Sequence, residues 1–491
     1  MKASPLQFIF YILSLSIFSC SPPPKKQNIL FIAVDDLRSE LGHFGNTQII
    51  TPNLDRLASS SVSFTNHFVQ VPTCGASRAS MLTGMRPRRS VELGNNIMQD
   101  EFQLKPETEK PETFIHHLRR NGYYTVGIGK ISHSADGLVY GYEEDVSETR
   151  ELPYSWDELL FDPGKWKTGW NAFFAFSNGE NRQSLKKQVK PYESGDIDDL
   201  GYPDGLTTQL ALSKLRELKD KEQPFFLGIG LFKPHLPFTA PKKYWELYDE
   251  ESIKIAANPT KPENVSENSL HPSGEFNQYT LGEEHPNLEK VASEAYARKI
   301  KHAYYAAASY ADAQIGLILD ELKELHLEEN TIVIIWGDHG WHLGEQQIWG
   351  KHTLFENALK SALIIKIPGQ EEKARLESSI VESLDIYPTL LELVGIDNPY
   401  ELDGESLVSL IETGQMPEGQ TAYGYFKQGI TVREDRYRLT KFFRSQEPSL
   451  ELYDHQSDPL ETINIADKNP ELVNKLMPVL EKGNTGLYEE K

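Results

Sequence analysis

The sequence predicts an α/β fold around a mostly parallel sheet, because a helical pattern leads into an apolar strand three times. The three repeats cover residues 112–130, 207–235 and 305–340. Each strand stops at polar residues, as does an earlier apolar run at residues 28–34. Ligands bind beyond the carboxyl ends of the strands in such sheets, so these polar residues are the first candidates for a site.

Other segments complete the expected architecture. Residues 51–64 predict a helix with Thr51 as its N-cap, and residues 383–396 predict a helix that ends at a glycine. Residues 421–443 alternate between apolar and polar side chains, which is typical of antiparallel strands. The polar, turn-rich stretch 258–284 predicts a long loop that borders a ligand cleft.

Composition narrows the class of ligand. The chain of 491 residues has 39% hydrophobic and 25% charged residues, and its formal net charge is −22. It is long enough to bury a large core. The acidic balance argues against a general nucleic-acid or anionic-membrane binder, because phosphate binding needs a clustered basic surface. An anionic ligand must therefore be held by a local basic pocket.

The N-terminus predicts export. Residues 1–20 combine a lysine near the start, an apolar run too short to span a bilayer, and small residues before Cys20. The ending SIFSC resembles a bacterial lipoprotein signal, in which Cys20 becomes the acylated first residue, and the proline-rich residues 21–27 predict a stiff tether. We expect a periplasmic or cell-surface lipoprotein of a bacterium that touches the membrane through this lipid only. The alternative is a plain signal peptide in which Cys20 is removed or idle.

Acidic residues follow two of the predicted strands. Asp35 and Asp36 end the first, and Asp338 and His339 end a later one. Carboxylates that converge from separate strand ends suit a hard divalent cation, although two aspartates alone are also typical of a helix cap or solvated turn. Four basic residues near strand ends and turns would surround an anionic substrate as cations or proton carriers: Lys130, His133, His235 and Lys351.

Cys74 lies among small residues in VPTCGASRASMLTG, residues 71–84. With Cys20 assigned to export, it is the lone cysteine of the mature domain and has no partner for an intramolecular disulfide. The turn that runs into RASMLTG predicts a loop entering a helix N-terminus, a place that binds anions. The alternative is a buried apolar cysteine, the commonest state of a free thiol.

These residues carry a resemblance to a known family. CGASRASMLTG resembles the sulfatase signature C-x-P/A-x-R followed by a T-G turn. The segments AVDDLR, GKISH, GLFKPHLPF, GDHGWHLGE and WGKH appear in the order found in type I sulfatases, with spacings most like those of the iduronate-2-sulfatases. The resemblance implies an alkaline-phosphatase-like α/β/α sandwich over residues 28–412. A smaller C-terminal subdomain with an antiparallel sheet would follow over residues 413–491.

The resemblance also implies a modified cysteine and a metal. A maturation enzyme would oxidise Cys74 to formylglycine, whose hydrated aldehyde would be the nucleophile. A geminal diol is a hard ligand that suits calcium, whereas a thiolate is soft. One calcium ion would be held by five residues: Asp35, Asp36, Asp338, His339 and the modified Cys74. Ala76 stands where the signature more often has proline, which bears on the maturation system that accepts the chain.

The catalytic roles follow from the same resemblance. Arg78 would steady the nucleophile and compensate negative charge. His235 or Lys351 would protonate the leaving sugar oxygen. His133, with Lys130 nearby, would help remove a proton from the second hydroxyl, so that the aldehyde reforms as sulfate leaves.

The resemblance points to a uronate 2-sulfate in oligosaccharides from an external polysaccharide of the ulvan or glycosaminoglycan type. Lys233 and Trp341 are expected to bind this substrate. Most aromatic residues of segment 154–174 are expected in the core, and others to stack on sugar rings. Three alternatives stay open: a sulfatase for a sulfated neutral sugar, a phosphate or phosphonate monoesterase of the same superfamily, and a non-catalytic glycan-binding lipoprotein.

Overall fold

The computed structural model describes residues 26–415, 419–443 and 448–488. The predicted signal segment with Cys20, and all but the last two residues of the tether, lie outside the described residues. In the part of the chain that is described, no helix is long and apolar enough to cross a membrane.

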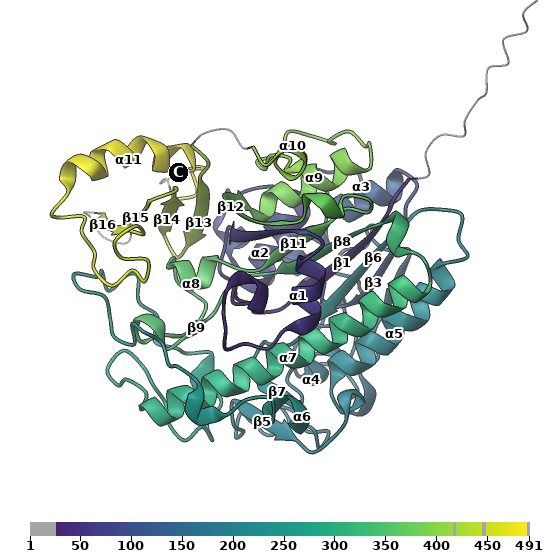
Figure 1. Ribbon diagram of the computed structural model, residues 1–491, viewed down its shortest axis with the longest axis horizontal. Coiled ribbons are helices and arrows are strands. Elements are labelled where there is room, and N and C mark those ends of the chain that lie inside the picture. The colour runs from purple at the N-terminus through teal and green to yellow at the C-terminus, as the bar shows by residue number, and fades with distance from the viewer. Residues whose placement is uncertain (1–25, 416–418, 444–447, 489–491) are drawn as a thin grey trace, which may run out of the picture.

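The centre of the molecule is an eight-stranded sheet with the order β12-β2-β11-β8-β1-β6-β3-β4 (Figure 1). The strands are β1 (Asn28–Val34), β2 (Val62–Phe68), β3 (Tyr124–Gly129), β4 (Glu158–Leu160), β6 (Phe225–Leu231), β8 (Thr331–Gly337), β11 (Leu363–Lys366) and β12 (Arg375–Glu382). Only β11 runs antiparallel to its neighbours, so the predicted, mostly parallel sheet is confirmed.

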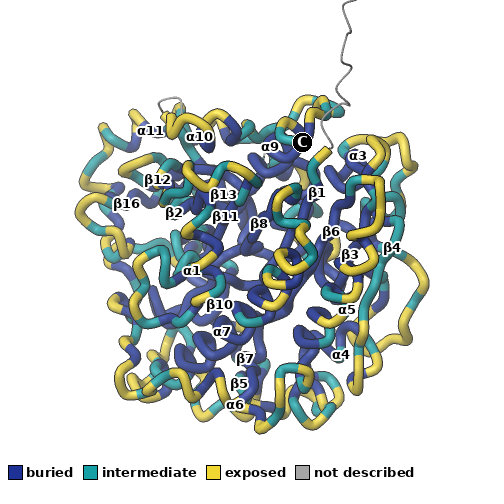
Figure 2. Tube along the Cα trace, turned by 45° about the vertical axis from the view of Figure 1, so that its right-hand side comes forward, coloured by how far each residue is buried: buried dark blue, intermediate teal, exposed yellow. Residues whose placement is uncertain are grey.

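Helices cover both faces of this sheet. One face carries α1 (Pro52–Ala58), α5 (Pro203–Leu218) and α7 (Glu294–Glu324). The other carries α2 (Cys74–Thr83), α3 (Phe114–Arg120), α9 (Ile386–Leu393) and α10 (Val408–Thr413). Strand β1 shows why two layers form, because its side chains alternate: Phe31 packs with α2 and α3, whereas Ile32 packs with α5 and α7. Figure 2 shows the central strands in the colour of buried residues.

A four-stranded antiparallel sheet follows the main domain, as predicted. It consists of β13 (Ala422–Phe426), β14 (Gly429–Arg433), β15 (Tyr437–Phe442) and β16 (Ser449–Asp454), and α11 (Pro470–Lys482) packs on it. Its core includes Phe68, Val71 and Ala76 of the main domain, so the small sheet docks beside the start of α2. The hairpin turn between β13 and β14 thereby reaches the edge of the site.

Short elements complete the frame around the site. They are α4 (Gly169–Phe173), β5 (Tyr192–Gly195), β7 (Phe238–Pro241), α6 (Lys242–Trp245), β9 (His342–Leu343), β10 (Trp349–Gly350) and α8 (Glu356–Leu359). Strands β5 and β7 pair in parallel, and β9 and β10 pair antiparallel.

The helix predicted over residues 51–64 is wrong in its second half. Helix α1 ends at Ala58, and β2 begins at Val62, because β-branched and aromatic residues follow the serine turn. Thr51 is the N-cap residue of α1, as predicted, but its hydroxyl donates to Asp55 and makes no side-chain cap bond. The predicted helix over residues 383–396 is confirmed in α9, which is followed by Gly395 with a φ of 67°.

Candidate active site

The predicted strand-end residues do meet at one edge of the sheet. Asp35 and Asp36 follow β1, His339 follows β8, and Lys130 follows β3. All four are fully buried. They converge because β8, β1, β6 and β3 are neighbouring parallel strands whose carboxyl ends share one edge.

Cys74 is the first residue of α2 and faces this edge. Its Sγ lies 3.2 Å from His339 Nε2, 3.2 Å from Lys351 Nζ and 3.5 Å from an oxygen of Asp35. Gly75 lets α2 start here, because a Cβ at this position would collide with the backbone of Asn95. Burial raises the pKa of the Cys74 thiol to about 12, so the unmodified side chain is a neutral thiol.

Four residues could together hold a metal ion, and we call them the strand-end cluster: Asp35, Asp36, Cys74 and His339. One ligand atom of each lies within 4.8 Å of the others. Asp36 Oδ2 is buried without a hydrogen-bond partner, which is costly for a carboxylate unless a cation binds it. The residues therefore fit a divalent cation. Two carboxylates favour a hard ion, and the imidazole is the less usual donor for calcium.

Asp338, predicted as a metal ligand, lies beside this cluster, with its Oδ1 3.7 Å from His339 Nε2, and accepts two hydrogen bonds. Its Oδ2 accepts a hydrogen bond from Arg78 Nε at 3.0 Å, and its Oδ1 accepts one from the backbone of Asp36 at 3.0 Å. It does not belong to the strand-end cluster. In this structure its side chain positions Arg78 and Asp36.

Arg78 and Lys130 compensate the buried carboxylates, as predicted for Arg78. Arg78 is fully buried, pairs with Asp338 at 3.0 Å, and also donates to the backbone carbonyls of Lys130 and Ile131. The Lys130 ammonium donates to Asp35. Both cations thus hold the carboxylates in place beside Cys74.

The predicted proton-transferring groups surround the same point. Lys351 Nζ lies 2.9 Å from Asp36 Oδ1, and against the effect of burial this carboxylate holds the pKa of Lys351 well above its usual value. Burial, assisted by the Lys130 charge, holds the pKa of His133 well below its ordinary value, and its Nδ1 has no hydrogen-bond partner. His133 is therefore a neutral base, and Lys351 is a proton-bearing ammonium.

His235 faces a residue that the motifs did not reveal. Its Nδ1 is 2.6 Å from the carbonyl of Leu236, and its Nε2 is 3.2 Å from Glu275 Oε1. Glu275 Oε2 also lies 3.6 Å from Lys351 Nζ. Burial and the Lys351 ammonium lower the pKa of His235 to about 4. Glu275 thus holds together the two groups predicted to protonate the leaving oxygen.

The direct substrate contacts predicted for Lys233 and Trp341 do not agree with the structure. The Lys233 ammonium is buried and donates to the backbone carbonyls of His235 and Pro237, so it shapes that loop. Trp341 is also buried, with Lys351 Nζ 5.2 Å from the centre of its ring. The Trp341 ring thus packs near Lys351. Neither Lys233 nor Trp341 lines the cavity.

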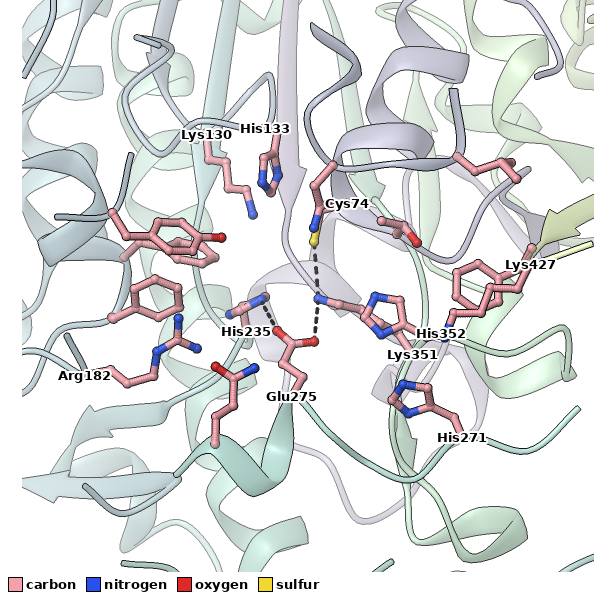
Figure 3. A pocket seen from close by; sticks show the side chains of 18 residues that line it. Cys74, Lys130, His133, Arg182, His235, His271, Glu275, Lys351, His352 and Lys427 are labelled. Atoms are coloured by element: carbon pink, nitrogen blue, oxygen red, sulfur yellow. Dashed lines mark hydrogen bonds and ion pairs between the residues drawn. The ribbon is translucent and has the colours of Figure 1, made fainter. Parts of the chain in front are cut away.

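A cavity of about 450 Å³ opens above Cys74 (Figure 3). Aromatic residues and a cation form one wall: Tyr142, Phe173, Phe174 and Arg182. The other wall consists of His271, His352, Phe426 and Lys427. The loop predicted over residues 258–284 does border the cavity, since it supplies His271, Glu275 and Gln278. No sequence motif marked Arg182, and Lys427 lies within the stretch 421–443 that was predicted only to form antiparallel strands.

A three-layer α/β sandwich with this cluster at its strand ends defines the alkaline-phosphatase-like sulfatase fold. The chain belongs to the sulfatase family, because the family model described as Sulfatase matches residues 27–396. A second model, described as N-sulphoglucosamine sulphohydrolase, C-terminal, matches residues 344–484. The protein is therefore a sulfuric ester hydrolase.

Individual relatives agree with this assignment. A sulfatase of Formosa agariphila is 31% identical, with 97% of this chain and 92% of the relative covered. The iduronate 2-sulfatase of Mus musculus is 30% identical, with 76% of this chain and 69% of the relative covered. The solved phosphonate monoester hydrolase of Silicibacter pomeroyi superposes with a TM-score of 0.71 at 21% identity, covering 94% and 95% of the two chains. That last likeness concerns the fold alone.

Proposed function

We propose that this sulfatase removes the 2-sulfate of a uronic acid in oligosaccharides from an external polysaccharide, of the ulvan or glycosaminoglycan type. The cavity carries this proposal: Cys74 lies at its floor among Lys130, His133 and Lys351, and its walls add aromatic faces and a further cation, Arg182. The cations suit a dianionic sugar, and the aromatic faces suit a sugar ring. The iduronate 2-sulfatase relative supports the same substrate class.

Cys74 becomes the nucleophile after oxidation to formylglycine by a maturation enzyme. The unmodified thiol is neutral and lies against Asp35, so it is a poor nucleophile. The hydrated aldehyde replaces sulfur with two oxygens at a place already surrounded by Lys351 and His339. One of these oxygens attacks the sulfur atom of the substrate's sulfate ester. Loss of the proton from the second oxygen then expels sulfate as the aldehyde reforms.

Calcium is the ion that we propose for the strand-end cluster. Asp35, Asp36 and His339 would hold it together with the modified Cys74. When bound, the ion supplies positive charge that polarises the sulfate oxygens. The otherwise unpartnered Asp36 Oδ2 supports this assignment.

Proton transfer is the work of the surrounding side chains. His133, a neutral imidazole with a free Nδ1, accepts the proton from the second hydroxyl. Lys351, the proton-bearing ammonium, faces the opposite side and protonates the sugar oxygen as it leaves, and Glu275 links it to the neutral His235. Arg78 compensates the negative charge of Asp338 and Asp35 beside the nucleophile.

Export and anchoring complete the proposal. The SIFSC ending and the proline-rich tether support a bacterial lipoprotein at the periplasm or cell surface, attached through Cys20. Such a location would place the enzyme where external polysaccharides are degraded. Membrane partitioning of the native protein, and its loss in Cys20→Ala, tests this assignment. A wild-type protein that is wholly unlipidated in its native cell would contradict it.

The substrate is tested by a desulfation assay on protein produced together with a maturation enzyme. Matched oligosaccharides carry the sulfate either on uronate O2 or on a neutral or amino sugar. We expect sulfate release chiefly from the uronate series. Release only from the other series would overturn the uronate assignment and leave the sulfatase family intact. Aryl sulfate compared with aryl phosphate and phosphonate esters, assayed in parallel, measures any monoesterase activity.

A further inference from the structure

Arg182 differs from every other buried arginine in the described residues. Four of the five buried guanidinium groups have a carboxylate partner, at 2.6–3.1 Å: Arg38, Arg78, Arg433 and Arg438. Arg182 is only 4% exposed, yet no carboxylate lies within 4.0 Å of it in the described part of the chain. A buried, unpaired cation is costly unless a ligand completes its interactions.

The surroundings of Arg182 hold the guanidinium in place. Its Cζ lies 3.5 Å from the centre of the Phe174 ring, and its Nε donates to Gln183 at 3.1 Å. Its backbone N–H donates to the carbonyl of Phe174, and its carbonyl accepts from Lys187. Stacking on Phe174, together with the Tyr279 ring 5.6 Å from Cζ and a side-chain hydrogen bond with Tyr279, offsets part of the burial cost, and the guanidinium still lines the cavity. Figure 3 shows this side chain on the cavity wall away from Cys74.

The other side chains of the cavity leave Arg182 as the best place for a second anion. Glu275 lies between His235 and Lys351 and would repel a second negative group there. On the opposite wall, burial lowers the pKa of His271 to about 4 and that of His352 to about 3, so both are neutral. Lys427 is exposed on a hairpin turn, where a charge contributes less to discrimination.

We propose that Arg182 is a specificity-determining residue, which binds a second anionic group of the substrate while the sulfate ester lies at Cys74. Under the proposed function, on which this inference rests, that group is the uronate carboxylate. A planar guanidinium matches a carboxylate through two parallel N–H···O bonds, and Phe174 beneath it keeps water from one face. A second sulfate is the other anion with compatible chemistry.

The test compares a disaccharide bearing uronate 2-sulfate with its carboxyl-reduced counterpart, which keeps the same sulfate. We expect Arg182→Gln to lower kcat/KM for the uronate substrate about 10²-fold, mainly through KM, because a buried charge pair is lost. The carboxyl-reduced substrate should change less than about threefold, since its neutral group makes no such pair. Arg182→Lys should retain an intermediate preference. Arg56→Gln, an exposed arginine paired with Asp320, is the matched control.

Binding gives a second readout that does not depend on maturation. Calorimetry with the Cys74→Ala protein should show the same loss of affinity for the uronate disaccharide when Arg182→Gln is added. Equal losses on both disaccharides, or no loss on the uronate one, would overturn the role of Arg182 in carboxylate binding.

A third arm separates this inference from the proposed function. If the wild-type enzyme does not prefer the uronate substrate, the proposed function fails by itself. A disulfated neutral disaccharide is then compared with its monosulfated form. Selective loss on the disulfated sugar in Arg182→Gln would keep Arg182 as an anion-binding residue and assign it to a second sulfate. Equal loss on both sugars would overturn the inference.

Discussion

Two groups of side chains in the described part of the chain have the residue types and spacing of a metal site, but only one of them keeps a buried carboxylate oxygen without a hydrogen-bond partner. The first is the strand-end cluster. The second, which we call the Arg438 cluster, joins α8 to the C-terminal sheet and contains Glu356, His455 and Glu461 within 4.8 Å of one another.

The Arg438 cluster is saturated by arginines. Arg438 Nε lies 2.6 Å from Glu461, and its Nη2 donates to Glu356. Arg433 Nε lies 3.1 Å from the same oxygen of Glu356. Two guanidinium groups therefore neutralise two carboxylates and leave no charge for a cation to compensate. This cluster fastens the small sheet to the main domain.

The strand-end cluster keeps an unsatisfied oxygen beside a cavity. Asp36 Oδ2 has no hydrogen-bond partner, and Cys74 lines the open space. Lys130 and Lys351 line the same cavity, where a bound sulfate group would also interact with their positive charge. Residue types and spacing alone therefore do not identify a metal site. A carboxylate oxygen without a hydrogen-bond partner, next to a cavity, does.

The largest effect is expected at Cys74. Cys74→Ala should lower turnover of any sulfate ester at least about 10³-fold, because the attacking group is removed. Peptide mass spectrometry of active wild-type protein should find formylglycine at this position. Thermal unfolding of the variant should stay close to wild type, and full activity in it would refute the proposed nucleophile.

The next effect concerns stability and belongs to the Arg438 cluster. Arg438→Met should destabilise the fold by about 3–5 kcal/mol, because it leaves Glu461 and Glu356 buried with less compensation. Denaturant unfolding measures this loss. Arg436→Gln, which removes a half-exposed arginine paired with Asp454, should cost less than about 1 kcal/mol. A near-neutral Arg438→Met would mean that the cluster does not fasten the two sheets.

Metal binding separates the two clusters directly. Asp36→Asn should weaken calcium affinity at least about 10²-fold, measured by calorimetry on chelator-treated protein, because changes even beyond the first ligands cost 10–100-fold. Glu461→Gln should leave calcium affinity unchanged although it lowers thermal stability. Calcium binding that is lost in Glu461→Gln and kept in Asp36→Asn would reverse the assignment of the two clusters.

The floor of the cavity could be predicted from the sequence because parallel strands bring their carboxyl ends together. Asp35, Asp36 and His339 meet there for that reason, and Cys74 starts the predicted helix. Side-chain direction could not be predicted in the same way. Lys233 turns toward backbone carbonyls that only the folded loop presents.

Most residues of the cavity walls could not be predicted from the sequence. Arg182 comes from a polar turn without periodicity, and its importance appears only when Phe174 is found beneath it. The loop with Glu275 was expected at the cleft, but the contact of its carboxylate with His235 depends on tertiary packing. Loop residues carry specificity here, and local patterns give least information about loops.

The smallest expected effect involves Glu451, a buried carboxyl outside both clusters that has no ion pair in the described part of the chain. It accepts hydrogen bonds from Ser266 and Ser269, and burial raises its pKa to about 7. A raised folded-state pKa stabilises the protein below the unfolded value near 4.5, and this contribution is lost as pH rises through about 7. Glu451→Gln stays neutral, so relative to wild type it should gain on the order of 1–2 kcal/mol between pH 5 and pH 8. Melting temperatures at the two pH values, with exposed Glu471→Gln as the control, measure this gain. A relative stability of Glu451→Gln that does not change with pH would show that Glu451 is ionised in the fold.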